Sequence, residues 1–356
     1  MDNIFGNRLI SARRMAGMSL QELADRLKNV VTKQSLSKYE QGKMKPDSEL
    51  LIALSNVLNV PVDYFFSSPG IKINLTNISY RKYVSKISKS EQGSVEEKAK
   101  EAFERYLELE SVLNFEEKSE YFTYENLIQN AYDAEDAAKE LRKRWKLGYD
   151  PIPDVVEMLE DKGYKVIEID APDGFDGMKA DIDGKKAIVL KQNKSGNEDV
   201  VRKRFTALHE LAHHALNFSN KLSEREEENL CHAFACAVLY PEDMARRELH
   251  KDRFHFYQNE LVLIKERWGI SFPAVFNRAK QLKIINDYVF RRFNIGYRER
   301  KLHLNEPGKF LSREKPVRFE RLIYLGLAKE AISINDAAFF SGKTVGEFRK
   351  QLYQLV

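Results

Sequence analysis

The 356-residue sequence contains only two cysteines, too few for a disulfide framework in a chain of this length. No apolar run approaches the roughly 20 residues that a membrane-spanning helix needs, and the N-terminus lacks the apolar core of a signal peptide. Repeats and low-complexity tracts are absent from the sequence too. We therefore expect a protein of the reducing cytoplasm, in which Cys231 and Cys236 are small buried residues rather than redox groups.

An excess of one charge is also missing. The chain has 58 lysines and arginines against 54 aspartates and glutamates, a net charge of only +4. Because the molecule as a whole is not a polycation, any contact with nucleic acid must be local. Charged residues (31%) and hydrophobic residues (43%) have the proportions of a soluble globular protein, and the length allows two or three domains.

The most informative stretch is a His-Glu-x-x-His motif that runs from His209 to His213. Apolar residues recur around it at helical spacing: Val201, Phe205, Leu208, Ala212 and Leu216. Two histidines four residues apart on a helix share one face, so both imidazoles can bind one metal ion. Glu210 lies further round the helix, where it can handle protons. Asn197, with two acidic residues after it, is predicted to cap this helix.

A catalytic zinc site of this kind needs a third protein ligand and one position open for water. Residues 224–239 are acidic at first and apolar later, which predicts a second helix. Glu228 lies on the apolar face of that helix, where a carboxylate is costly unless it is paired or bound to metal. We predict Glu228 as the third ligand, with Glu224 and Glu227 as alternatives.

The stretch from residue 202 to 241 resembles the ImmA/IrrE-type zinc metallopeptidases. The resemblance is carried by the His-Glu-x-x-His motif and by Arg204, Phe205, Thr206, Glu228, Phe234, Ala235 and Pro241, and upstream by the segment Phe175-Asp176-Gly177-Met178. The chain departs from the usual family residues at Ala207 and Leu208, whose order is swapped, and at Cys231, His232 and Tyr240. The resemblance implies a Zn2+ site with His209, His213 and Glu228 as ligands and Glu210 as general base. A site that keeps its ligands but serves as a sensor or a structural clip is the alternative.

The first 68 residues are predicted to form five short helices, and residues 8–65 resemble the lambda-repressor-like helix-turn-helix, or XRE, family. The matching positions are Arg13, Gly17, Ser19, Leu23, Ala24, Leu36, Ser37, Tyr39, Glu40, Gly42, Pro46, Leu50, Leu54, Leu58, Val60, Asp63 and Phe65. The resemblance implies a structural ion pair between Arg13 and Glu40. The segment between Ala24 and Glu40 is two residues longer than is usual in the family, and residues 29–31 are the expected insertion.

Five lysines and one acidic residue lie between residues 28 and 45, which favours contact with DNA. A recognition helix places its N-terminal residues near base edges in the major groove of a double-stranded operator. We predict Lys33, Gln34, Ser35 and Lys38 at that surface, with Lys43 and Lys45 at phosphates. A helix-turn-helix that serves only as a protein-interaction module is the alternative.

Four regions are expected: a helix-turn-helix domain (1–68), a helical connector (69–128), a metallopeptidase-like domain (129–245) and a helical C-terminal domain (246–356). A capping box at Ser94 and Glu97 predicts a long helix in the connector, either a spacer or the surface of a homodimer. Strands are predicted at 165–170, 174–183 and 186–190. A strand edge beside a zinc site could bind a substrate peptide by strand addition.

The C-terminal third gives fewer functional signals. Residues 260–282 predict a helix pair that packs into a core, or else a second, degenerate helix-turn-helix. A basic patch interleaved with aromatic residues follows, and it is either a nucleic-acid surface or a solvated face over an aromatic core; its members are Tyr288, Phe290, Arg291, Arg292, Phe293, Tyr297, Arg298, Arg300 and Lys301.

Together these signals predict an α+β, mostly helical protein of several domains. The first functional hypothesis is a DNA-binding transcriptional regulator with a zinc endopeptidase site. Family resemblance implies that such a site cleaves a repressor-like or antitoxin-like protein, or the chain itself, in stress or mobile-element control. The alternative is a non-proteolytic transcription factor whose metal pocket senses a metal or ligand.

Overall fold

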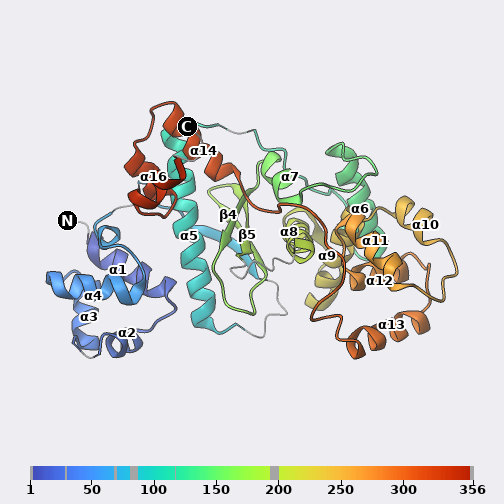
Figure 1. Ribbon diagram of the computed structural model, residues 1–356, viewed down its shortest axis with the longest axis horizontal. Coiled ribbons are helices and arrows are strands. Elements are labelled where there is room, and N and C mark those ends of the chain that lie inside the picture. Colours follow the sequence, from blue (N-terminus) through green and yellow to red (C-terminus); the bar gives the residue numbers. More distant parts are fainter. Residues whose placement is uncertain are drawn as a thin grey trace.

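The structure is a computed structural model that describes residues 3–28, 30–67, 70–80, 87–116, 118–192 and 200–352. It is built mostly of helices with one small mixed sheet, which confirms the expected α+β fold class. The N-terminal helices lie at one end, the sheet lies in the middle and a second group of helices lies at the other end (Figure 1). None of the helices in these ranges is long and apolar enough to cross a membrane.

The N-terminal domain is a bundle of five short helices: α1 (Ile4–Met15), α2 (Leu20–Arg26), α3 (Lys33–Glu40), α4 (Ser48–Leu58) and the 3-10 helix η1 (Val62–Phe65). Side-chain caps set the starts of the four α-helices, as at Thr32, whose side chain accepts a hydrogen bond from Ser35 N. The predicted ion pair is confirmed, with Arg13 Nε 2.7 Å from Glu40 Oε1. The expected insertion begins at Asn29, which lies outside the described residues.

The long helix of the connector, α5 (Lys89–Val112), begins before the predicted capping box. Ser88 and Glu91 form the capping box instead, so the prediction for Ser94 is wrong. Ser94 lies inside the helix, and its hydroxyl donates a 2.5 Å hydrogen bond to Met15 O of α1. An ion pair of 2.8 Å between Arg8 and Glu101 joins the same two helices, so the helix-turn-helix domain is docked directly on α5.

The apolar stripe of α5 is used inside the chain. Its buried side chains join one core with the sheet and with the last helices of the chain; they include Val95, Ala99, Phe103, Tyr106, Leu107 and Leu109. A stripe that is already covered on both sides is neither a bare spacer nor a free dimer surface. The predicted end of the helix-turn-helix domain, at residue 68, lies outside the described residues.

The sheet has the strand order β1-β4-β5-β3, formed by β1 (Leu75–Tyr80), β4 (Gly177–Ile182), β5 (Lys185–Lys191) and β3 (Lys165–Ile169). β4 pairs antiparallel with both β1 and β5, whereas β3 pairs parallel with β5. The sequence predicted β3, β4 and β5. It did not predict β1, which lies in the connector that was expected to be helical. Two short strands, β2 (Leu127–Ile128) and β6 (Asn217–Phe218), pair separately.

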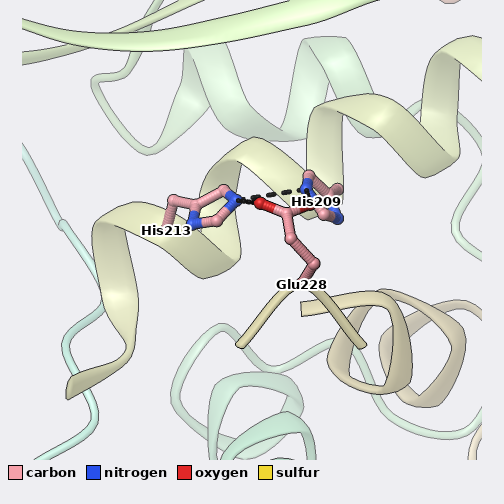
Figure 2. A group of neighbouring side chains, drawn as sticks. All are labelled: His209, His213 and Glu228. Carbon is pink, nitrogen blue, oxygen red and sulfur yellow. Dashed lines mark hydrogen bonds and ion pairs between the residues drawn. The ribbon is translucent and has the colours of Figure 1, made fainter. Parts of the chain in front are cut away.

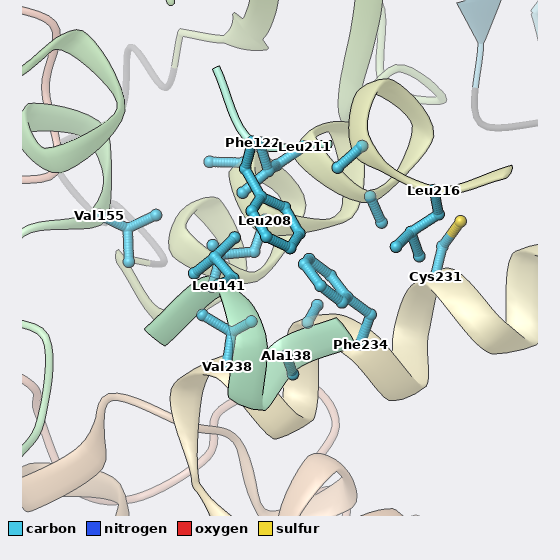
Figure 3. Packing of buried hydrophobic residues seen from close by; sticks show 14 of the residues in the cluster. Phe122, Ala138, Leu141, Val155, Leu208, Leu211, Leu216, Cys231, Phe234 and Val238 are labelled. Carbon is cyan, nitrogen blue, oxygen red and sulfur yellow. The ribbon is translucent and has the colours of Figure 1, made fainter. Parts of the chain in front are cut away.

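Four helices build the core next to the sheet: α6 (Ala131–Arg144), α7 (Val155–Asp161), α8 (Val200–Ala215) and α9 (Glu224–Leu239). Figure 3 shows Leu208 and Leu211 of α8 packed with Ala138 and Leu141 of α6 and with Phe234 of α9. A large apolar side chain that is fully buried in this way contributes about 1.5–3 kcal/mol. This packing holds α8 and α9 together and so decides where their polar side chains lie.

The remaining helices pack in two places. One group surrounds Trp268 and packs against α9; it consists of α10 (Glu242–Leu249), α11 (Gln258–Trp268), α12 (Phe272–Gln281) and α13 (Asp287–Glu299). The other group returns to α5 and consists of α14 (Arg318–Ala328), α15 (Ile334–Phe340) and α16 (Val345–Leu352) (Figure 1). Within α12 only Asn277 and Lys280 are exposed, which favours the core-packing interpretation over a second recognition helix.

Candidate metal centre

The two histidines of the motif lie one turn apart on α8 and point the same way. Their Nε2 atoms are 3.1 Å apart, as the helical spacing predicts. The flanking apolar residues of α8 face the core and fix the rotation of the helix. The predicted N-terminal cap at Asn197 lies outside the described residues.

Glu228 reaches the same point from α9. Its carboxylate oxygens lie 3.2 Å from His209 Nε2 and 3.4 Å from His213 Nε2, and Figure 2 shows the three side chains converging. A capping box at Ser223 and Glu226 starts α9, and the packing of its apolar residues against α8 turns the face that carries Glu228 inward. The alternatives are not part of this group: Glu224 is exposed and Glu227 is only half-buried. Among the described residues this trio is the one group with the spacing of a metal site.

The donor set suits zinc. Two imidazole nitrogens and a carboxylate oxygen lie within 4.8 Å of one another, and this ligand combination is typical of catalytic zinc with a fourth position open. Glu228 is 3% exposed, and a carboxylate buried that far is stable only when it is paired or bound to a cation. Burial alone would raise the pKa of Glu228, but hydrogen bonds and charge from His209 and His213 outweigh burial and hold that pKa well below its usual range.

Glu210, the predicted general base, is fully buried beside the trio. The backbone of β4 approaches it closely at Gly177, where an added Cβ would lie 3.2 Å from Glu210 Oε1 and only 2.6 Å from Thr206 Cγ2. Glycine is therefore required where the sheet passes the site. This glycine belongs to the Phe175–Met178 segment that resembles the metallopeptidase family, but the resemblance predicted no role for it.

Lysines from the sheet hold the C-terminal end of α8. Lys179 donates to His213 O at 3.2 Å, and Lys186 donates to His214 O at 3.0 Å. Positive charge at the C-terminal carbonyls of a helix is favourable. No signal in the sequence identified these lysines, because they are far from α8 along the chain.

Four other side chains near the site, from α8, α9 and the end of α9, have different positions. The ring of His232 is 4.7 Å from that of His209, and Cys231 Sγ is 3.6 Å from His213 Nδ1, so both lie against the ligands. His214 turns to the sheet, where its Nε2 is 2.9 Å from Ala187 O and burial lowers its pKa to about 4. Tyr240 donates its hydroxyl hydrogen to Glu248. His214 and Tyr240 are therefore structural.

The centre is enclosed. His209 and Glu210 are 0% exposed, and the side chain of His213, the most open of the group, is 11% exposed. A polypeptide cannot reach the trio in this arrangement unless a neighbouring element moves.

The predicted DNA-binding residues lie on and after α3. Lys33, Gln34, Lys38 and Lys43 are exposed, as is Lys45. Ser35 is half-buried, and its hydroxyl is 3.1 Å from that of Thr32, so it serves the start of the helix. Since α1 is the helix docked on α5, the exposed face of α3 is left open for a partner.

Two family profiles match the chain. Residues 9–65 match the helix-turn-helix family, and residues 159–280 match the IrrE N-terminal-like domain. No solved structure is detectably similar to the chain.

Several curated proteins are similar over a short segment. The SPbeta prophage-derived uncharacterized HTH-type transcriptional regulator YonR of Bacillus subtilis (strain 168) is 39% identical over 75 residues, which are 21% of this chain and 68% of that protein. The HTH-type transcriptional regulator ImmR of the same organism is 36% identical over 74 residues, 20% of this chain and 57% of ImmR. An uncharacterized HTH-type transcriptional regulator of Sinorhizobium medicae (strain WSM419) is 39% identical over 66 residues, 18% of this chain and 46% of that protein.

These matches agree with the geometry of the N-terminal domain and of the candidate metal centre. The docked five-helix bundle, with the exposed face of α3, corresponds to the helix-turn-helix match, and α8 and α9 lie inside the second matched segment. The chain therefore belongs to the XRE-type helix-turn-helix transcriptional regulators, DNA-binding proteins, and it carries an IrrE/ImmA-like peptidase domain behind its DNA-binding domain.

Proposed function

We propose that this regulator, acting in the cytoplasm, is also a zinc-dependent endopeptidase. The observation that supports the proposal best is the convergence of His209, His213 and Glu228 beside the buried carboxylate of Glu210. Its substrate is a repressor-like or antitoxin-like protein, or the chain itself. The prophage origin in the name of one relative supports a role in the control of a mobile element.

The residues of the site have distinct tasks. His209, His213 and Glu228 would hold Zn2+, which when bound lowers the pKa of a coordinated water and polarises a carbonyl. A carboxylate oxygen of Glu210 accepts the proton of the attacking water and delivers it to the leaving amine. Cys231 Sγ, 3.6 Å from His213 Nδ1, helps to fix the orientation of that imidazole.

A second candidate function is favoured by the enclosure of the same group. A metal held by ligands that are between 0% and 11% exposed suits a sensor or a structural clip as well as a hydrolase. In that case the protein is a transcription factor whose metal state changes its regulation, and Glu210 has no proton to transfer.

A Glu210→Gln variant separates the two functions. Because glutamine keeps the shape but cannot accept the proton, we expect zinc stoichiometry to be unchanged and cleavage to fall by about 100-fold or more. Cleavage is measured by mass spectrometry on cells and on purified protein with a quenched peptide library. If the wild-type protein cleaves nothing, and the variant regulates its promoter as the wild type does, the endopeptidase proposal is wrong.

Contacts to DNA are tested by two substitutions on the α3 surface. Lys43→Ala is expected to weaken binding about equally for all sequences and to reduce the slope of log affinity against log salt by about 1. Gln34→Ala is expected to cost about 1–3 kcal/mol on the selected operator and little on random DNA. Operators are selected in vitro from random DNA, and binding is followed by fluorescence anisotropy. An effect of Gln34→Ala that is the same on both DNAs would remove Gln34 from the base-reading surface.

We infer that the regulator binds its operator as a homodimer, because helix-turn-helix proteins usually read two symmetric half-sites. The covered stripe of α5 is not the contact surface. Sedimentation of the complex with selected operator DNA measures the stoichiometry, and a single chain per operator at saturation contradicts the inference.

A further inference from the structure

The strand edge next to the candidate metal centre is occupied by another part of the same chain. β4 begins at Gly177, the residue whose added Cβ would lie 3.2 Å from Glu210 Oε1. β1 pairs antiparallel with β4 from Ile182 to Met178, and its last residue is the partner of Met178. The end of β1 therefore lies one residue from the point where β4 passes Glu210. Without β1, this side of β4 would be a free edge next to the site.

β1 is held more loosely than the other strands of the sheet. None of residues 75–79 is buried, whereas β3, β4 and β5 each bury four residues. Its pairing is interrupted by a shift in register between Thr76 and Ser79, where Asn77 has a φ of +50°. A bulge of this kind disrupts the local ladder of hydrogen bonds. β1 is thus the strand that costs least to remove.

The contacts that do hold β1 are of the kind that an incoming peptide could replace. Leu75 and Ile78 pack partly buried against the core under the sheet, and the Asn77 side chain donates to Asp181 at 2.6 Å. Backbone pairing with two apolar side chains on one face is how an extended peptide adds to a sheet edge.

We propose that β1 is an internal occupant of the substrate-binding edge: an extended polypeptide segment binds β4 in place of β1, and the site is closed while β1 is paired. This inference rests on the proposed endopeptidase function and extends it to substrate class and regulation. Substrates are segments that can adopt a strand with apolar side chains spaced like Leu75 and Ile78. The enclosure of the metal centre is the closed state.

The covalent attachment of β1 makes it a strong competitor. It lies between the helix-turn-helix domain, which ends near residue 67, and α5, which begins at Lys89, so both of its ends are tethered. A segment tethered in this way acts at an effective concentration on the order of mM. A weakly binding peptide in solution then pairs with β4 only when β1 is displaced, and cleavage follows the fraction of molecules that are open.

A reversible crosslink tests the proposal. Thr76 and Asp181 are partners in the register of β1 and β4, and Cα atoms of antiparallel partners are close enough for a disulfide. The double variant Thr76→Cys/Asp181→Cys therefore locks β1 on β4 when oxidised. The native Cys231 and Cys236 are buried, with pKa values raised by that burial, so they do not compete for the crosslink. The same protein reduced with a phosphine is the matched control.

We expect the oxidised form to cleave a quenched peptide library about 10-fold more slowly than the reduced form or worse, at equal zinc content. Ile78→Asp, which removes an apolar contact of β1, is expected to cleave faster than wild type by a similar factor. Equal rates in the locked and reduced forms overturn the proposal while leaving the endopeptidase function intact.

A binding measurement decides the case if no form cleaves. The probe is a synthetic peptide with the sequence of residues 71–80, IKINLTNISY, and the readout is hydrogen exchange of residues 177–182. We expect the peptide to slow exchange in Ile78→Asp but not in the locked form. Absence of cleavage with this protection rejects only the endopeptidase function, whereas absence of protection in Ile78→Asp overturns the inference about the edge.

Discussion

His213→Ala is expected to abolish stoichiometric zinc binding. The variant leaves His209 and Glu228 as the only two donors of a trio whose ligand atoms lie within 4.8 Å of one another. We expect the affinity for zinc to fall by more than the roughly 100-fold that loss of a ligand's hydrogen-bond partner can cost. Zinc per chain is measured by atomic emission after dialysis against a competing chelator. Zinc should also raise the melting temperature of the wild-type protein but not that of the variant.

His303→Ala is the matched control, because His303 is exposed, lies in the loop after α13 and is not part of the trio. It should keep one zinc per chain. Full zinc retention by His213→Ala, or equal loss in both variants, would show that the metal is bound elsewhere.

Arg204→Met is expected to lower the free energy of unfolding by about 3–5 kcal/mol, a large fraction of the 5–15 kcal/mol typical of a domain. Arg204 and Glu314 are both 0% exposed, and Arg204 Nη1 lies 2.5 Å from Glu314 Oε1. The guanidinium also donates to Ile152 O at 2.7 Å, and the Phe310 ring lies 4.3 Å from it. Methionine fills much of the volume but leaves the carboxylate buried without its cation. Chemical denaturation at pH 7 measures the loss.

The pH dependence of that loss identifies its cause. Burial raises the pKa of Glu314, and the charge of Arg204 opposes this rise, so the pKa in Arg204→Met is expected to be higher still. A carboxyl whose pKa is raised on folding favours the folded state at low pH and loses that contribution as pH rises through its folded pKa. The deficit of the variant should therefore shrink as pH falls.

An exposed ion pair supplies the control for Arg204. Arg321 and Glu157 lie 2.9 Å apart with their side chains 64% and 44% exposed, and Arg321→Met should cost less than about 1 kcal/mol. Equal losses in Arg204→Met and Arg321→Met would mean that burial does not decide the strength of the Arg204 pair.

Features that depend on residue spacing within one helix, or on the residues at one helix end, were predictable from the sequence. His209 and His213 converge because four residues make about one helical turn, and Glu228 lies inward because it is on the apolar face of its helix. The start of α9 at Ser223 follows from the same short-range chemistry. For such features the pattern of residues and the geometry of the backbone carry the same information.

Predictions failed where they had to say which element packs against a given apolar face. The stripe of α5 was read as a spacer or a dimer surface, but it is covered by the sheet and by α14–α16 of the same chain. An amphipathic stripe states that a face will be buried and not what will bury it. The cap at Ser94 was misplaced for a related reason, since two candidate capping boxes occur within six residues of each other and only one can start the helix.

Spacing within a helix was therefore enough to predict that His209, His213 and Glu228 converge, and resemblance to a known family identified the helix-turn-helix domain. Tertiary packing was needed to bring β1 to the edge of β4, Gly177 against Glu210, and Glu314 to Arg204. Those contacts join residues that are far apart in the sequence, from 33 positions for Gly177 and Glu210 to 110 positions for Arg204 and Glu314. Pairing over such separations depends on which apolar surfaces are still exposed after the local helices and strands have formed. Helical or strand periodicity shows which face of an element is apolar, but not which other element packs against it.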